Sequence, residues 1–309
     1  MKLVPKPFFR YNYLMDTSKK IGLTLGGGGA KGYAHIGVYK VLHDNNIPIA
    51  AVAGSSIGAM IGAGIAQGKS PEEIMQVMAK LVKNKKHLVS LKFLGGKGAL
   101  LNAEDEYKIM EKLIPADLTF ADLKIPLVVN AVDLEKGEEV IFKEGNVFKA
   151  VLASSAVPGL YPPVFYQDKL LIDGGIVNGT PVDLCKSMGV DCQIAVDLKS
   201  YSSEQNISGL IYEFYIKEKQ EKKYKLPFKH HFFKEAVQKF GFPVNVMLRS
   251  LAIASQKHTD RIFADIKPEV LIHPEVNQFS IVDIEHYKQI YKRGIKAGEE
   301  ALKDIKNLL

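Results

Sequence analysis

The sequence predicts an α/β fold in which a mainly parallel central sheet is covered by helices on both faces, giving a three-layer sandwich. Short apolar runs with strand character alternate with segments of helical periodicity over most of the 309 residues. Two of these runs lead directly into glycine-rich turns that open a helix. This order is typical of a parallel sheet, because parallel strands need crossover connections.

The first strand is predicted at residues 21–25 and is followed by a helix over 33–46, where apolar residues recur at spacings of three and four. A second strand at 49–53 leads through a serine-containing turn into a helix that ends near residue 67. Gly68 suits the cap of that helix, because glycine readily adopts the left-handed conformation found there.

The next helix has a recognisable start. Ser70 suits the N-cap, Pro71 suits the first helical position, and Glu73 completes a capping box. Later apolar runs predict five more strands and a final helix. The strands are residues 127–132, 139–142, 169–172, 193–196 and 270–273, and the helix is 284–308.

Composition divides the chain into four parts. Residues 1–19 form a basic, aromatic N-terminal arm without the apolar region of a secretion signal, and residues 20–200 form the core. Residues 201–265 are rich in aromatic residues, and seven lysines against two glutamates between 217 and 234 supply +5 of the net charge of +7. We expect this part to be a helical cap inserted into the fold. Residues 266–309 are expected to return a strand and a helix to the core.

Cysteine content and hydropathy indicate the compartment of the protein and whether it spans a membrane. Cys185 and Cys192 are too few for a disulfide framework, so we expect buried free thiols in a cytoplasmic protein. The most apolar run, residues 51–66, is too short to span a bilayer. The basic, aromatic cap suits a solvated surface or contact with anionic lipid at the inner face of the membrane. Nucleic acid is not expected as a partner, and homo-oligomers are left open.

The first chemical motif is G-x-S-x-G over residues 54–58, between the second strand and its helix. Gly54 and Gly58 allow a sharp turn on which the hydroxyl of Ser56 would stand exposed, with the positive end of the helix directed at it. The same residues also fit a tight turn with an N-capping serine. The pattern by itself leaves both interpretations open.

The glycine loop at residues 26–32 lies between a strand and a helix, where backbone N–H groups can form an anion cradle. Gly27, Gly29 and Gly32 satisfy the G-x-G-x-x-G of dinucleotide-binding loops, but the acidic residue expected about 20 positions later is missing. The nearest match to a phosphate loop, residues 63–70, lacks the first glycine and lies at a helix end. An oxyanion hole that faces a nucleophile on the adjacent strand fits both loops at once.

The third motif is the aspartate-glycine-glycine sequence of Asp173, Gly174 and Gly175 at the end of a predicted strand. Sheets of this class build their sites where parallel strands end, and two glycines let a backbone or a ligand come close. The alternative is a simple turn in which the aspartate bonds its own backbone. Asp133 and Asp197 also end predicted strands, so position alone does not select Asp173.

These three loops, in this order, resemble the patatin-like phospholipase family. Three motifs of that family match in sequence: G-G-G-x-[K/R]-G at 27–32, G-x-S-x-G at 54–58 and D-G-[GA] at 173–175. The block at 153–159 and the TPVD at 180–183 are also similar, whereas Asn178 and Gly179 depart from the paired asparagines common there. The resemblance covers residues 20–200, which would then be the catalytic core.

The resemblance implies a lipid acyl hydrolase of phospholipase A or lysophospholipase type with a patatin-like core. It makes Ser56 the nucleophile and Asp173 the base of a dyad that needs no histidine, metal or cofactor. Gly27, Gly28 and Gly29 would form the oxyanion hole, chiefly through the last two amides. The substrate would be a phospholipid or lysophospholipid taken from a membrane surface with which the protein makes transient contact.

Three alternatives stay open. An acyltransferase would use the same dyad with an alcohol in place of water. A Ser-Asp-His esterase is formally allowed, because five histidines follow the aspartate: His230, His231, His258, His273 and His286. A catalytically idle protein would bind lipid or nucleotide through the glycine loop. Two residues beside that loop have expected structural roles: His35 inside the first helix, and Lys31 as a solvated or structural cation.

Overall fold

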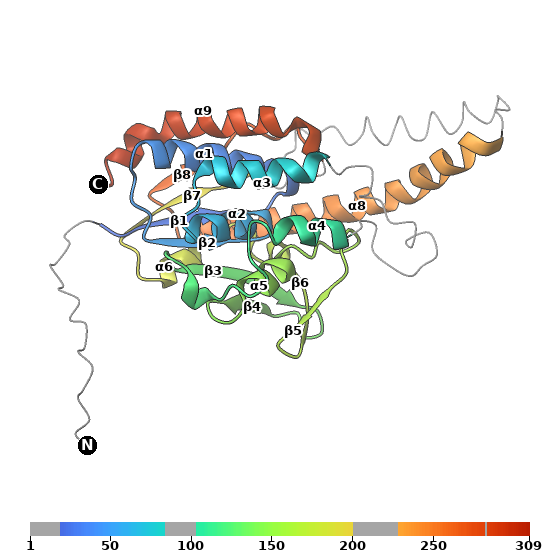
Figure 1. Cartoon of the computed structure of the whole chain (residues 1–309), viewed down its shortest axis with the longest axis horizontal. Coiled ribbons are helices and arrows are strands. Elements are labelled where there is room, and N and C mark those ends of the chain that lie inside the picture. Colours follow the sequence, from blue (N-terminus) through green and yellow to red (C-terminus); the bar gives the residue numbers. More distant parts are fainter. Residues whose placement is uncertain (1–18, 84–102, 200–227, 282) are drawn as a thin grey trace, which may run out of the picture.

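The computed structural model describes residues 19–83, 103–199, 228–281 and 283–309, and helices flank both faces of a central sheet (Figure 1). The strands are β1 (Ile21–Leu25), β2 (Ala51–Gly54), β3 (Leu127–Asp133), β4 (Glu139–Phe142), β5 (Val164–Tyr166), β6 (Lys169–Asp173), β7 (Cys192–Val196) and β8 (Val270–Ile272). The α-helices are α1 (Tyr33–Asp44), α2 (Ile57–Ala66), α3 (Pro71–Lys83), α4 (Ala103–Met110), α5 (Val147–Ser154), α6 (Val182–Ser187), α8 (Phe228–Asp265) and α9 (Tyr287–Lys306). Short 3₁₀ turns are η1 (Gly29–Gly32), η4 (Phe120–Asp122), η5 (Gly174–Ile176) and η6 (Ile284–His286).

The sheet follows the order β5-β6-β3-β2-β1-β7-β8, and β4 pairs with β3. Strands β3, β2, β1, β7 and β8 are parallel to their neighbours in this series. At the other side of the sheet, β4 and β6 run antiparallel to β3, and β5 runs antiparallel to β6. The predicted α/β class and mainly parallel sheet are confirmed, and the sheet also has an antiparallel margin. The three residues of β5 were missed because so short a run carries no measurable alternation.

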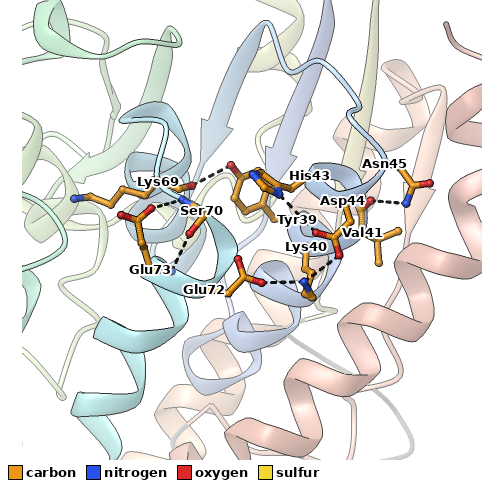
Figure 2. Close-up of polar contacts among 10 residues, drawn as sticks. All are labelled: Tyr39, Lys40, Val41, His43, Asp44, Asn45, Lys69, Ser70, Glu72 and Glu73. Carbon is orange, nitrogen blue, oxygen red and sulfur yellow. Dashed lines mark hydrogen bonds and ion pairs between the residues drawn. The ribbon is translucent and has the colours of Figure 1, made fainter.

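The predicted start of α3 is confirmed by its hydrogen bonds (Figure 2). The Glu73 amide donates to the Ser70 hydroxyl at 3.2 Å, and the Ser70 amide donates to the Glu73 carboxylate at 2.7 Å. Helix α1 lies beside this turn, because the Tyr39 hydroxyl donates to the Lys69 carbonyl at 3.1 Å (Figure 2). Gly68, just before the cap, has the predicted left-handed φ of 77°.

The C-terminal part joins the core at two places. Strand β8 pairs with β7, and α9 packs along α1 on one face of the sheet (Figure 1). The two helices approach closely through glycines, since a Cβ on Gly37 would lie 2.3 Å from the Tyr291 carbonyl oxygen. A Cβ on Gly294 would lie 2.1 Å from the carbonyl oxygen of Ala34. Any larger residue at these two positions would force the helices apart.

The predicted cap contains one long helix, α8, of 38 residues. Its C-terminal part contacts α6 and η5, while its N-terminal part extends past the rest of the described chain (Figure 1). Most of the lysine-rich run at 217–234, and the whole arm at residues 1–18, fall outside the described residues.

Two further predictions concern cysteines and membrane spans. Cys185 and Cys192 are free and buried, as predicted. Burial raises the pKa of the Cys185 thiol to about 11, so this thiol stays protonated at neutral pH. In the part of the chain that the structure describes, none of the helices combines the length and the hydropathy needed to cross a bilayer.

Candidate active site

Ser56 stands on a sharp turn between β2 and α2. Its backbone has a φ of 53° and a ψ of −123°, a conformation that costs free energy in a residue with a side chain. The flanking positions require glycine, because other backbone atoms lie where a Cβ would stand. A Cβ on Gly58 would lie 2.0 Å from the Leu25 carbonyl oxygen, and one on Gly54 would lie 2.6 Å from the Ala59 nitrogen. The motif therefore forms a strained turn of the kind that exposes a nucleophile in serine hydrolases, and not an ordinary capped turn.

The structure brings the Ser56 hydroxyl and the Asp173 carboxylate together. The Ser56 Oγ donates to Asp173 Oδ2 at 2.7 Å, although 117 residues separate the two in sequence. Both residues are nearly buried, with exposed fractions of 7% and 6%. The second carboxylate oxygen, Oδ1, accepts a 2.7 Å hydrogen bond from the Gly175 amide. One carboxylate oxygen is thus held by the backbone while the other faces the serine.

Sheet register explains how this contact arises. Gly54 at the end of β2 pairs with Val129 of β3, and Asp173 at the end of β6 pairs with Ala131, two residues farther along. Ser56 is also two residues beyond Gly54, so hydroxyl and carboxylate lie at about the same height on opposite sides of β3. The expectation that Asp173 ends a parallel strand was wrong, because β6 is antiparallel to β3. The antiparallel register nevertheless delivers the carboxylate to the serine.

Burial is the main influence on the acidity of Asp173. Removing the carboxylate from water raises the pKa of Asp173 from 3.8 to about 6, against the hydrogen bonds from Ser56 and Gly175, which lower it. Asp173 is therefore a stronger base than a solvated aspartate and is still ionised at neutral pH. This combination suits a group that accepts a proton from a neighbouring hydroxyl.

The other strand-ending aspartates have different partners. Asp133 Oδ1 accepts from the amides of Glu135 and Lys136 in the β3–β4 turn. Asp197 Oδ1 accepts from the Thr180 hydroxyl and the Lys199 amide. Neither carboxylate hydrogen-bonds Ser56, so the tertiary structure distinguishes the three aspartates that strand position alone left open.

The glycine loop passes close to Ser56, and its amides have different partners. The Gly27 amide donates to the Gly179 carbonyl at 2.8 Å. The expectation that Gly27 supplies an oxyanion-hole amide is therefore wrong, because that donor is already used. The amides of Gly28 and Gly29 donate to no backbone carbonyl within the described residues, and both glycines line the cavity beside Ser56. These two remain the candidate donors for an anion.

The family model for patatin-like phospholipases matches residues 23–186 of this chain, slightly more than half of its length. The chain belongs to the patatin-like phospholipase family. This match includes all three loops that meet at the site. The motifs predicted from sequence thus coincide with the family's region of similarity.

Related proteins are similar to this chain over part of their lengths. An uncharacterised NTE family protein of Mycobacterium tuberculosis is 35% identical over 188 residues, which are 59% of this chain and 50% of the relative. The lysophospholipase NTE1 of Pyricularia oryzae is 31% identical over 189 residues, 60% of this chain and 12% of that protein. The chain therefore spans half or less of these relatives. The solved structure of VipD from Legionella pneumophila has the same fold, with a TM-score of 0.50, 16% identity, and coverage of 93% of this chain and 67% of VipD.

In this member of the family, an apolar cavity of about 270 Å³ adjoins Ser56 and Asp173. Ser56, Asp173 and the glycine loop lie at one part of its wall. The rest of the wall is mainly apolar and comes from α2, α4, α5, the 157–161 loop and α8, including Met60, Met110, Leu152, Leu160, Leu248 and Leu251. Such a cavity can accommodate a hydrocarbon chain while its ester group lies against the serine.

Ser154 is a site residue whose role the sequence did not reveal. Its hydroxyl accepts a 2.8 Å hydrogen bond from the Ser56 amide, so the end of α5 holds the turn that carries Ser56. Ser154 lies in the 153–159 block that resembles the family. The similarity of the 153–159 block to the family indicated that these residues matter. It could not indicate the contact with Ser56, which lies 98 residues away in sequence.

His35 and Lys31 support the glycine loop from beneath. His35 is fully buried and its Nε2 lies 2.7 Å from the Gly26 carbonyl oxygen, and burial lowers its pKa to about 4, so the ring is neutral and donates there. The Lys31 ammonium is also buried and donates to the Lys199 carbonyl at 3.2 Å. Burial, and secondarily the charge of Arg249, lowers the pKa of Lys31 to about 8, while Asp197 opposes this shift. Both roles are structural, as expected, but Lys31 is not solvated.

No described histidine takes part in the Ser56–Asp173 contact. His273 Nδ1 lies 3.2 Å from the Asp197 carbonyl oxygen, and the His286 ring stacks on Phe279. His230 and His231 fall outside the described side chains. Among the described histidines, the geometry thus gives the Ser-Asp-His alternative no support.

One group of possible metal ligands occurs within the described residues: Asp283, Glu285 and His286, in and beside η6. It includes neither Ser56 nor Asp173. Exposed acidic groups of this kind are common without an ion. We therefore assign it no part in the site.

Proposed function

We propose that the protein is a serine acyl-ester hydrolase that acts on phospholipids or lysophospholipids through a Ser56–Asp173 dyad. The observation that carries this proposal is the 2.7 Å hydrogen bond from the serine hydroxyl to the buried carboxylate, at the wall of an apolar cavity. Family membership supports the reaction class, and the name of the fungal relative supports a lysophospholipid as substrate.

The reaction follows from the roles of four groups. Asp173 accepts the hydroxyl proton as Ser56 Oγ attacks the acyl carbonyl carbon, and the negative charge that develops on the carbonyl oxygen is held by the amides of Gly28 and Gly29. The C–O bond to the alcohol then breaks, and Asp173 returns its proton to the leaving oxygen. Water attacks the acyl-serine next and gives a proton to Asp173. The bond from the acyl carbon to Ser56 Oγ then breaks, and Asp173 returns that proton to Oγ, which leaves the free fatty acid and the free serine.

A fluorophosphonate probe tests the proposal directly. We expect it to label Ser56 covalently, and we expect purified protein to release free fatty acid from a lysophospholipid. Mass spectrometry of the labelled peptide and of the lipid products measures both. Absence of labelling would contradict the proposal, and transfer of the acyl group to an added alcohol in preference to water would favour the acyltransferase alternative.

We further propose that the protein meets its substrate at a lipid surface through the antiparallel margin of the sheet. Phe165 and Leu134 are 72% and 49% exposed. They lie on either side of Leu170 in β6, because Phe165 of β5 pairs with Leu170 and the Leu134 amide, just after β3, donates to the Leu170 carbonyl. Leu170 is three residues from Asp173 along β6, so these side chains lie about 10 Å beyond the catalytic carboxylate. Exposed apolar side chains that gather at a site edge commonly mark contact surfaces.

Replacing Phe165 with serine is expected to weaken binding to phosphatidylcholine vesicles by about tenfold or more, since burial of a phenylalanine contributes about 1.5–3 kcal/mol. Hydrolysis of a water-soluble p-nitrophenyl ester should stay unchanged. Leu271→Ser is the matched control, because Leu271 is 39% exposed on β8 at the opposite side of the sheet. Co-sedimentation with vesicles measures the effect, and equal loss in both variants would refute this surface.

A further inference from the structure

A single buried asparagine lies in the middle of β3, which is otherwise apolar until its final aspartate. Asn130 is fully buried, and its side-chain nitrogen is surrounded by three oxygen acceptors. Nδ2 lies 2.9 Å from Glu139 Oε1, 3.2 Å from the Gly174 carbonyl oxygen and 3.0 Å from the Asn178 carbonyl oxygen. Because an amide nitrogen carries two hydrogens, at least one of them is shared between two acceptors. A buried polar group with this many partners fixes its surroundings.

Two of the three acceptors belong to the turn that follows the catalytic base. The amides of Val177 and Asn178 both donate to the Gly174 carbonyl, which closes this turn on itself. Asn130 binds the Gly174 and Asn178 carbonyls at its two ends. The fit is tight, since a Cβ on Gly174 would lie 2.4 Å from the Asn130 backbone oxygen. The turn therefore cannot shift or rotate without breaking the contacts of Asn130.

The same turn orients the carboxylate of Asp173. The Gly175 amide inside the turn donates to Asp173 Oδ1, and only the other oxygen, Oδ2, receives the Ser56 hydroxyl. A rotation of the turn would withdraw the Gly175 amide and free the carboxylate to leave the serine. Asn130 thus acts on the reacting atoms indirectly. It holds the turn, and the Gly175 amide of the turn holds the Asp173 carboxylate.

Three acceptors together determine which way the Asn130 amide faces: Glu139 and the two carbonyls of the turn. An acceptor at 2.9 Å requires nitrogen, and not oxygen, on that side of the amide. Glu139 is itself partly buried, and this burial raises its pKa, while the hydrogen bond from Asn130 lowers it. The charged groups facing Glu139 from other elements are Asp183 of α6 and His258 of α8.

We propose that Asn130 is a positioning residue that holds the 174–178 turn so that Asp173 Oδ2 faces Ser56, with Glu139 as a third acceptor that helps to keep the Asn130 amide in place. This inference rests on the proposed function, because it assigns Asn130 a role in delivering the base of that reaction. Asn130 itself touches neither Ser56 nor the cavity.

Asn130→Leu retains a similar volume and removes both amide hydrogens. We expect kcat for a p-nitrophenyl ester to fall roughly tenfold to a hundredfold, as for a misplaced catalytic group, while KM changes less than about twofold. The acid limb of the kcat profile should also move to higher pH, because loss of the Gly175 hydrogen bond removes an interaction that lowers the pKa of Asp173. A purely structural role would lower the amount of folded enzyme without moving that limb.

A control and a second pair of variants make the outcome decisive. Gln193→Leu removes another buried strand amide, on β7, and should leave the acid limb in place. If Asn130→Leu does not fold, Glu139→Ala should lower kcat severalfold, whereas Glu139→Gln, which keeps an oxygen acceptor, should restore it. Wild-type kcat and an unmoved limb in folded Asn130→Leu, or equal kcat in the two Glu139 variants, would overturn the inference. Inactive wild-type protein would instead refute the proposed function.

Discussion

Replacing Ser56 with alanine is expected to lower kcat for ester hydrolysis by roughly 10⁵–10⁶-fold, the size of loss seen when a serine hydrolase loses its nucleophile. Alanine removes the hydroxyl that donates to Asp173, so no acyl-serine can form. The substitution should also relax the strained backbone of the turn only slightly, because alanine retains a Cβ. Steady-state kinetics on a p-nitrophenyl ester, with fluorophosphonate labelling as a second readout, measure the effect.

The neighbouring serine provides a matched control for this experiment. Ser55 is fully buried beside Ser56, and its hydroxyl has no hydrogen-bond partner within the described residues. Ser55→Ala removes an unsatisfied buried hydroxyl, so we expect activity within about twofold of wild type and no loss of stability. Comparable inactivation by both substitutions would show that disturbance of the turn, and not loss of the nucleophile, explains the result.

Asp173→Asn is expected to lower kcat by about 10⁴-fold, because an amide cannot accept the hydroxyl proton. The pH–rate profile of the wild-type enzyme should show the same dependence on the ionised carboxylate. Activity should be lost as pH falls through about 6, where the carboxylate becomes protonated, and should be level above it. The variant should show no such limb in its residual activity. Kinetics between pH 4 and 9 test both expectations.

The same substitution should stabilise the fold at neutral pH. The pKa of Asp173 is raised from 3.8 to about 6, so between these values the folded protein holds a proton that the unfolded chain releases. Stability contributed by this group therefore falls as pH rises through that window, and the wild type carries the cost of a buried carboxylate above it. Relative to wild type, Asp173→Asn should gain about 1–3 kcal/mol in the free energy of unfolding at pH 8, and much less at pH 4. Urea denaturation at the two pH values measures this difference.

Asp133 is the control for the aspartate experiments, since it is equally buried and also ends a strand. Asp133→Asn keeps the oxygen that accepts from the Glu135 and Lys136 amides. We expect little change in activity and no stabilisation at pH 8. A variant of Asp173 that behaved like this control would mean that its carboxylate is neither the base nor destabilising.

Local features of the site could be predicted because they depend on neighbours in sequence. The capping box of Ser70 and Glu73 forms within one helical turn, and the glycines at 54 and 58 are needed by the backbone that surrounds Ser56. Apolar periodicity likewise predicted α1 and most strands, since the side chains that face the core recur at a spacing set by the element itself. The order of the three motifs was sufficient to indicate the family.

Long-range partners were decided only by the tertiary structure. Nothing in the sequence distinguished Asp173 from Asp133 and Asp197 on position alone, because each follows an apolar run. The choice depends on the register of β6 against β3, which places one carboxylate level with the Ser56 hydroxyl. The use of the Gly27 amide by Gly179 depends in the same way on which loops become neighbours.

By itself, then, the sequence determined the chemical groups: a serine on a glycine-flanked turn, a loop of glycines and a set of strand-ending aspartates. Tertiary structure decided which groups meet, which amides of the glycine loop have a backbone partner among the described residues, and that Asn130 binds the turn after Asp173. The physical reason is that hydrogen bonds across more than about a hundred residues depend on strand order and register. A linear pattern specifies the strands but not their pairing.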